Sequence, residues 1–166
     1  FIDKELLPKF YIDASGNAIR ARIMLLYQDK ELNLLSNTTK LGDQFITRNH
    51  DLEQTYQNRL IDYGFSCNIK EQAFYLEDID FIALFLEHGL KDLCLDYQVL
   101  VSKEVKNKHI LKDVAVRSSF EIGKDNILSY QFTCNEISKE EMADFMKYVK
   151  DRKKYYPLKD GNLISL

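Results

Sequence analysis

Residues 18–27 place an apolar side chain at every second position, and this alternation restricts the fold more than any other feature. The apolar positions are Ile19, Ala21, Ile23 and Leu25. A period of two residues is typical of a strand with one buried face. A short strand over residues 10–12 and a turn over residues 14–17 come before it. The order of strand, turn and strand indicates a sheet whose strands we expect to be mostly antiparallel.

Two helices are expected between this sheet and the middle of the chain. Asn49 or Asp51 can cap a helix that runs to about residue 63, where Gly64 suits its end. A second helix is expected over residues 78–88. Gly89 follows it and is interpreted as its C-terminal signal.

The second half of the chain predicts a third helix and two hairpins. Ser138 and Glu141 form a capping box, the clearest helix start in the sequence. Alternating runs over residues 114–122 and 127–134 predict one hairpin, and residues 155–166 predict another. The fold class is therefore expected to be α+β, with mostly antiparallel strands and about three main helices.

A chain of 166 residues fits one ordinary domain. A chain of this size buries about 70% of its unfolded surface, so it needs no disulfide or metal to hold a core. We expect a single domain over residues 1–166, with a weak subdomain boundary near residues 64–76, where residues 65–75 look extended. Phe1 in place of an initiator methionine and the apolar end at Leu166 favour a fragment of a longer polypeptide.

The cysteines and histidines show no metal or catalytic pattern. The three cysteines are an odd number without a Cys-x-x-Cys pair, which argues against a zinc ribbon or a disulfide framework. We expect three reduced, mostly buried thiols in a cytosolic protein: Cys67, Cys94 and Cys134. No histidine has a partner at metal-ligand spacing; the three are His50, His88 and His109. The pattern identifies no catalytic residue, although a small cytosolic enzyme with a Cys–His or carboxylate site formed in space stays an alternative.

The sequence lacks the usual nucleotide-binding motifs. A phosphate loop needs an earlier glycine at fixed spacing and a hydroxyl residue after the lysine, whereas Asp125 follows the single Gly123-Lys124 pair. The sequence contains no Asp-Glu dipeptide that could form an acidic box for magnesium. We therefore expect no ATP hydrolysis by this chain alone, and no cofactor.

Basic and aromatic residues gather after the third expected helix. This basic patch comprises Lys147, Lys150, Arg152, Lys153, Lys154, Tyr155 and Tyr156. Cations interleaved with aromatic rings can bind a nucleic-acid backbone and stack on its bases, so the patch is a candidate nucleic-acid site. The alternative is that the cations only stabilise the C-terminus of the helix, and the net charge of −3 favours this interpretation.

The closing block Lys-Lys-Tyr-Tyr-Pro-Leu-Lys-Asp-Gly-Asn-Leu, residues 153–163, and the preceding Glu136 to Glu141 resemble the accessory domain of bacterial SWI/SNF-type helicases. Residues 22–27, 46–49 and 81–93 look like earlier blocks of that family. Pro157 and Asn49 depart from its usual residues. The family motifs look structural, with no catalytic residue among them.

The resemblance implies a cytoplasmic, DNA-translocating ATPase as the parent protein. ATP and magnesium would then belong to its motor domain, outside this sequence. The expected partner is that motor domain in the same chain, with DNA as a further candidate and no membrane. The chain itself would be a non-catalytic accessory domain that positions the motor or contacts DNA or partner proteins.

Overall fold

The computed structural model describes residues 6–112, 114–122 and 128–166, with side chains described outside residues 118–132. The chain divides into two compact units, Phe1–Lys108 and His109–Leu166. Both mix helices with mostly antiparallel strands, so the expected α+β class is confirmed. Residues 64–76, the expected boundary region, all belong to the first unit.

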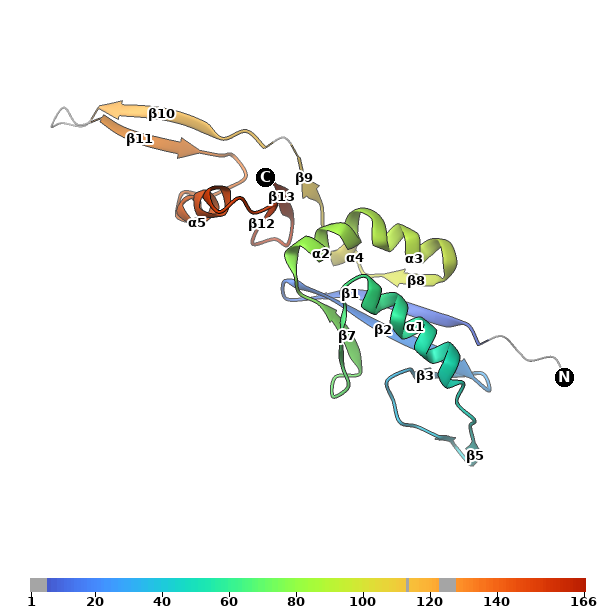
Figure 1. Cartoon of the computed structure of the whole chain (residues 1–166). Coiled ribbons are helices and arrows are strands. Elements are labelled where there is room, and N and C mark those ends of the chain that lie inside the picture. Colours follow the sequence, from blue (N-terminus) through green and yellow to red (C-terminus); the bar gives the residue numbers. More distant parts are fainter. Residues whose placement is uncertain (1–5, 113, 123–127) are drawn as a thin grey trace. The chain divides into compact units, whose positions relative to one another are not determined.

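The first unit is built on a six-stranded sheet in the order β6-β7-β2-β1-β8, with β3 also paired to β2 (Figure 1). Its strands are β1 Pro8–Ser15, β2 Ala18–Tyr27, β3 Lys30–Asn33, β6 Ser66–Asn68, β7 Ala73–Leu76 and β8 Gln98–Val101. The parallel β1–β8 pair is the exception among antiparallel ladders. A parallel neighbour requires a crossover, and the intervening helices supply it.

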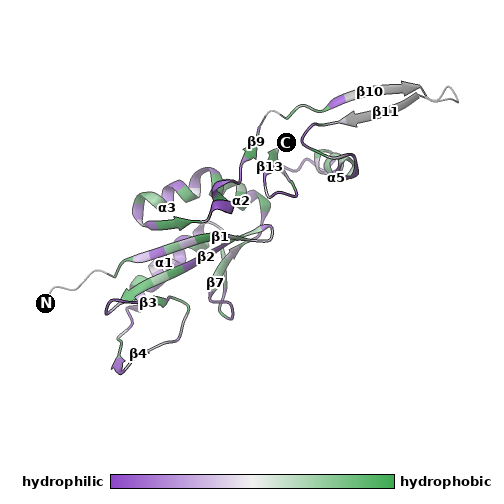
Figure 2. Ribbon diagram, turned by 180° about the vertical axis from the view of Figure 1, so that it is seen from behind, coloured by the Kyte–Doolittle hydropathy of each residue, from purple (hydrophilic) through white to green (hydrophobic). Residues whose placement is uncertain are grey.

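The central hairpin follows the predicted alternation. β2 covers residues 18–27, and its four expected core residues are all buried. Gly16 has a φ of 60°, which lets the chain turn tightly between β1 and β2. The residues between the buried positions stay half-buried or exposed, and Figure 2 shows polar and apolar residues interleaved along both strands. One sheet face therefore carries the core and the other faces solvent.

Helices cover the core face of the sheet. They are α1 His50–Asp62, α2 Ile79–Leu84, the π-helix η1 Phe85–Gly89, α3 Leu90–Asp96 and the short α4 Lys103–Lys106. α1 lies in front of β1 and β2 in Figure 1 and behind them in Figure 2. Its Tyr56 packs edge-on against Tyr97, which in turn contacts Phe10 of β1. Aromatic rings thus join α1 and the end of α3 to the sheet.

The prediction that Gly89 ends a helix is wrong. The helical path continues without a break from α2 through η1 to Asp96. A Cβ atom at Gly89 would lie 2.8 Å from Cδ1 of Phe85 and 3.2 Å from Cδ1 of Tyr63. The Phe85 ring of the same helix and the Tyr63 ring at the end of α1 fill the space that a side chain would need, so glycine suits close packing here rather than a helix end.

Residues 65–75 form a hairpin rather than one extended run. β6 and β7 pair antiparallel, and the turn between them lacks glycine and proline. Gln72 adopts the left-handed conformation instead, with a φ of 53°. Without a glycine, proline or asparagine signal at that position, the turn was not visible in the pattern.

A long loop separates β3 from α1. It contains β4 Lys40–Leu41 and β5 Gln44–Phe45, which pair with each other. Residues 36–42 are mostly polar, which is typical of a loop, but this polarity does not indicate the small ladder.

The second unit consists of α5 Lys139–Lys150 and two small sheets. β12 Tyr155–Pro157 and β13 Leu163–Ser165 form the expected C-terminal hairpin, and β13 also pairs with β9 Ile110–Leu111. Pro157 ends the edge strand β12, a position that suits a residue without a backbone N–H. The other expected hairpin is β10 Arg117–Ile122 with β11 Leu128–Thr133, and its turn lies outside the described residues. The core of this unit comprises Cys134, Ile137, Phe145, Tyr156, Leu158 and Ile164.

Candidate functional site

The basic patch lies at the end of α5 and in the turn that follows it. The cations of the patch are all exposed: Lys147, Lys150, Arg152, Lys153 and Lys154. Among the described residues, none of them has a carboxylate oxygen within 4.0 Å, whereas Lys159 lies 3.5 Å from Glu141. Asp151 is the one acid within this stretch. The patch therefore presents a local excess of positive charge to solvent.

A Schellman motif fixes the chain direction within the patch. The N–H of Arg152 donates to the carbonyl of Val149 (3.1 Å), and that of Lys153 donates to the carbonyl of Tyr148 (3.0 Å). Arg152 occupies the left-handed position of this motif with a φ of 55°. The motif terminates α5 and sends Lys153 and Lys154 into β12.

The two tyrosines of the patch have different environments. Tyr156 is 3% exposed and packs edge-on against Phe145 and Tyr148, with ring centroids 5.2 and 5.0 Å apart. Burial raises the pKa of its hydroxyl. The ring is a core element and is not presented for base stacking. Tyr155 is half-buried, so the structure leaves it as the one tyrosine of the pair with partial solvent access.

A buried charge network holds the loop between β3 and α1. The guanidinium of Arg48 makes two bonds to the carboxylate of Glu53, from Nε to Oε2 (2.8 Å) and from Nη2 to Oε1 (2.6 Å). It also donates to three loop carbonyls, those of Leu34, Ser36 and Thr38. The Arg48 and Glu53 side chains are only 7% and 6% exposed. Every N–H of the guanidinium has an acceptor, which is what a buried arginine requires.

Tyr27 completes this network. Its hydroxyl donates to Oε2 of Glu53 (2.7 Å) and accepts the backbone N–H of Asn49 (2.9 Å). Burial raises the pKa of the Tyr27 hydroxyl. Because its hydrogen bonds are made to neighbouring structure, the network is a structural clamp at the start of α1 rather than an open reactive site.

A second polar cluster joins α1 to α3. Arg59 donates from Nη2 to the carboxylates of Asp92 (3.0 Å) and Asp96 (2.7 Å), and from Nε to the hydroxyl of Tyr63 (2.8 Å). The Tyr63 hydroxyl in turn donates to Asp92 (2.5 Å). This hydrogen bond, together with Arg59, lowers the pKa of Asp92. The cluster fixes the two helices against each other on their exposed side.

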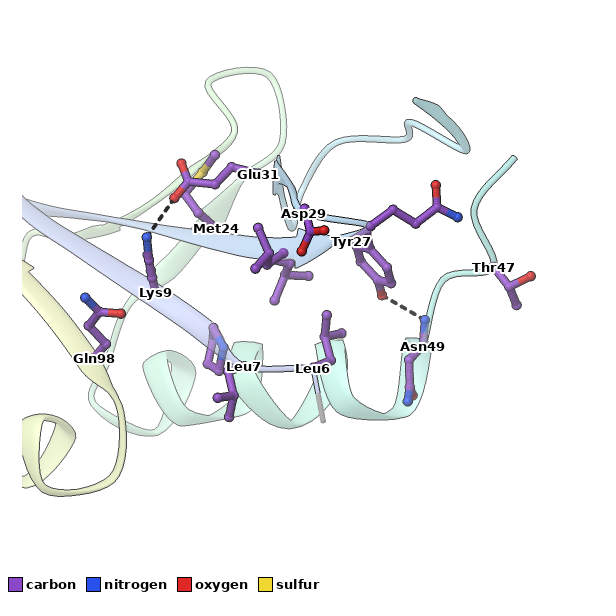
Figure 3. Close-up of a pocket in the computed structure, with 14 residues that line it drawn as sticks. Leu6, Leu7, Lys9, Met24, Tyr27, Asp29, Glu31, Thr47, Asn49 and Gln98 are labelled. Carbon is purple, nitrogen blue, oxygen red and sulfur yellow. Dashed lines mark hydrogen bonds and ion pairs between the residues drawn. The ribbon is translucent and has the colours of Figure 1, made fainter. Parts of the chain in front are cut away.

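One cavity of about 500 Å³ lies at the open end of the β1–β2 hairpin, where β1 begins and β2 ends (Figure 3). Its ionic side chains are Lys9, Asp29 and Glu31, of which Lys9 lies 3.2 Å from Glu31. Figure 3 shows this pair to the left of Asp29 and the Tyr27–Asn49 bond to its right. Leu7, Met24 and Leu26 make much of the remaining wall. No histidine or cysteine is among the described residues that line it.

A second hollow of about 380 Å³ lies along the helices of the first unit. It is lined by Asp62, Tyr63, Phe81, Leu84, Phe85, His88, Gly89 and Asp92. Phe81 and Leu84 are 47% and 51% exposed, although both are large and apolar. The sequence patterns did not predict this groove. A signal was present, because Phe81 and Leu84 lie off the buried stripe of their helix.

The expectation that the thiols are mostly buried is wrong. Cys67 and Cys94 are exposed and only Cys134 is buried. Desolvation raises the pKa of the Cys67 and Cys134 thiols, which disfavours the reactive thiolate at both positions.

The three histidines lie in different parts of the chain. His50 begins α1, His88 lies in η1 with a 3.7 Å contact to Glu87, and the backbone N–H of His109 donates to Asn162. Within the described ranges, no group of three or more His, Cys, Asp or Glu side chains could hold a metal ion.

Comparison with known proteins places these observations in context. The family model described as bacterial SNF2 helicase associated matches residues 1–166, the whole chain. No curated protein and no solved structure matches the chain. In the part of the chain that the structure describes, every helix is too short or too polar to traverse a bilayer.

Proposed function

The chain belongs to the bacterial SNF2 helicase-associated family, and from this premise we propose that it is a non-catalytic accessory domain of an ATP-dependent DNA helicase or translocase. It would position the motor domain of the same polypeptide or contact DNA or partner proteins. ATP and magnesium would bind to that motor, and the parent would act in the cytoplasm. The two solvent-exposed thiols fit a reducing compartment.

The observation that carries this proposal is the family match over the whole chain, in a sequence that lacks a phosphate loop. In the structure, the buried Arg48–Glu53 ion pair is fully engaged with neighbouring groups, so its part in the protein is to hold the fold.

Measurement of ATP turnover tests the non-catalytic role. The purified chain should release no phosphate from ATP and magnesium above a buffer blank, with or without duplex DNA. Turnover that follows the protein through successive purification steps would overturn the proposal.

A second candidate function is direct DNA contact through the basic patch. It is favoured by the five exposed cations without a carboxylate partner among the described residues. Because Tyr156 is buried, this contact would rest on phosphate neutralisation, with Tyr155 as the accessible ring. Binding of this kind depends on counterion release and falls steeply with salt.

Replacement of Arg152, Lys153 and Lys154 by glutamine tests the patch. If all three cations contact phosphates, the slope of log K against log salt should flatten by about 2.7, since each contact contributes about 0.9. Glutamine at Lys103, Lys106 and Lys108 removes the same charge elsewhere and should leave most of the slope intact. Equal slopes for the patch variant and the unmodified chain would reject the site.

A further inference from the structure

The groove along α2, η1 and α3 is an apolar surface with a defined shape. Phe81 and Leu84 are three residues apart, so they lie on one helix face and form its exposed wall. Phe85 and Gly89 are buried beneath them. Two large apolar side chains that are half exposed beside a hollow are typical of a protein-binding surface.

The backbone of the first unit holds this groove open. A Cβ atom at Gly64 would lie 3.0 Å from Cγ of Phe81, so the Phe81 ring rests against the turn after α1. Gly89 presents no side chain to the hollow, and a Cβ atom there would meet the Phe85 ring. The wider turn of the π-helix spans the same residues, and such turns are frequent at functional sites. The groove therefore exists before any partner arrives.

The groove has an acidic surround. Asp62 and Asp92 line it, and the helical segment of residues 77–96 carries six acids against one lysine, Lys91. Figure 2 shows hydrophilic and hydrophobic residues alternating around α3. Arg59 forms ion pairs with Asp92 and Asp96 and so neutralises part of their negative charge. Among the described residues, Asp62, Glu77 and Asp80 have no cation within 4.0 Å, so negative charge remains for a partner to neutralise.

We propose that this groove binds a basic, amphipathic helix of a partner protein. Apolar side chains at i and i+3 or i+4 of that helix would pack against Phe81 and Leu84, and its lysines or arginines would lie over Asp62 and the neighbouring acids. The acidic surround repels phosphate, which excludes a nucleic-acid backbone as the occupant. This inference rests on the proposed accessory role and names the surface and the partner chemistry that the role leaves open.

A synthetic peptide tests the groove directly. The probe is a fluorescein-labelled helix of leucine and lysine with about 15 residues, near the length at which isolated helices form. Its fluorescence anisotropy is followed as the chain is titrated in. Saturable binding is expected, whereas a leucine–glutamate peptide of the same pattern and a scrambled leucine–lysine peptide should bind at least about tenfold more weakly.

Matched variants locate the binding. Leu84→Ser should weaken binding by about tenfold, because it removes one wall of the groove. Leu95→Ser is the control, since Leu95 is 84% exposed on α3 but does not line the groove. Asp62→Asn should reduce the salt dependence of binding, and Asp43→Asn in the loop before α1 should not. Circular dichroism of each variant confirms that it is folded.

Several outcomes would overturn this inference. One is that the leucine–lysine peptide does not bind. Another is that the leucine–glutamate peptide binds with the same affinity as the leucine–lysine peptide. A third is that Leu84→Ser and Leu95→Ser reduce the affinity for the leucine–lysine peptide equally. Self-association of the chain that Leu84→Ser abolishes would assign the groove to a second copy instead. None of these results bears on ATP turnover, so the accessory role and the groove can fail separately.

Discussion

Arg152 holds a backbone conformation that a side chain makes costly. The same Schellman geometry ends α1, where Gly64 occupies the left-handed position with a φ of 104° and its N–H donates to the carbonyl of Ile61. The first helix therefore ends on the usual residue and the fifth helix on an arginine. A left-handed residue with a Cβ atom costs roughly 1–2 kcal/mol relative to glycine.

Arg152→Gly should therefore stabilise the second unit. The relief of backbone strain is partly offset by the greater freedom of glycine in the unfolded chain, which leaves a gain of about 0.5–1 kcal/mol. Urea unfolding followed by circular dichroism measures the change. Arg152→Lys retains the Cβ atom and the charge, so it should leave the unfolding free energy unchanged. A loss of stability in the glycine variant would contradict this account.

Single residues differ in how far local sequence could predict them. The sequence predicted Asn49 or Asp51 as the cap of α1. In the structure Asn49 is the cap, and its Oδ1 accepts the N–H of Leu52. The burial of Glu53 was not predictable, because both of its partners lie outside α1. Arg48 lies in the loop before the helix, and Tyr27 lies on strand β2. Helical periodicity indicates which face of a helix is apolar, but it does not indicate which charged side chain forms a buried ion pair.

Gly89 shows at the level of the element how one signal can have two causes. Glycine ends many helices, yet it also allows two elements to approach closely. In this chain the neighbouring rings of Phe85 and Tyr63 decide between the two. The information needed lies in tertiary packing, because Tyr63 belongs to the end of α1.

Gly89→Ala should destabilise the first unit. Alanine favours a helix over glycine by up to about 1 kcal/mol, but overpacking a filled site costs about 1–3 kcal/mol. We expect a net loss of about 1 kcal/mol in urea unfolding. In a Phe85→Leu background the substitution should cost less, since the ring that it meets is gone. A stabilising effect in the unmodified chain would show that the helix has room for a methyl group.

The whole molecule consists of two units, each with its own buried residues. Among the residues whose side chains the structure describes, the buried members of the C-terminal core come from residues 134–164. The length of the chain suggested one domain, and no linker rich in glycine or proline marks the junction after Lys108. The division was not readable from composition, since it reflects which elements contact each other.

Phe145→Ala should disturb the second unit far more than the first. Removing this buried ring costs about 3–5 kcal/mol in the unit that contains it. Hydrogen exchange measured by mass spectrometry should then accelerate across His109–Leu166 while Phe1–Lys108 keeps its protection. Leu60→Ala in α1 is the reciprocal variant and should give the opposite pattern. Equal loss of protection in both units would contradict independent cores.

At this scale the fold was more predictable than the candidate site. Periodicity and caps gave the class, the central hairpin and the starts of α1 and α5. The positions of the basic patch were also readable, but the burial of Tyr156 depends on Phe145 and Tyr148 from another element. The groove at Phe81 depends on Gly64 and Tyr63 from α1, so no local window contains it.

The Arg48 clamp also has a consequence for the chain that it encloses. Its bonds to three loop carbonyls and to Glu53 act as a non-covalent cross-link, which closes the segment from Leu34 to Glu53 into rings. An exposed ion pair would loosen as counterions accumulate, but a buried one is screened much less. The loop that carries exposed Phe45 at its tip should therefore keep its shape at salt concentrations that detach DNA from a surface of lysines.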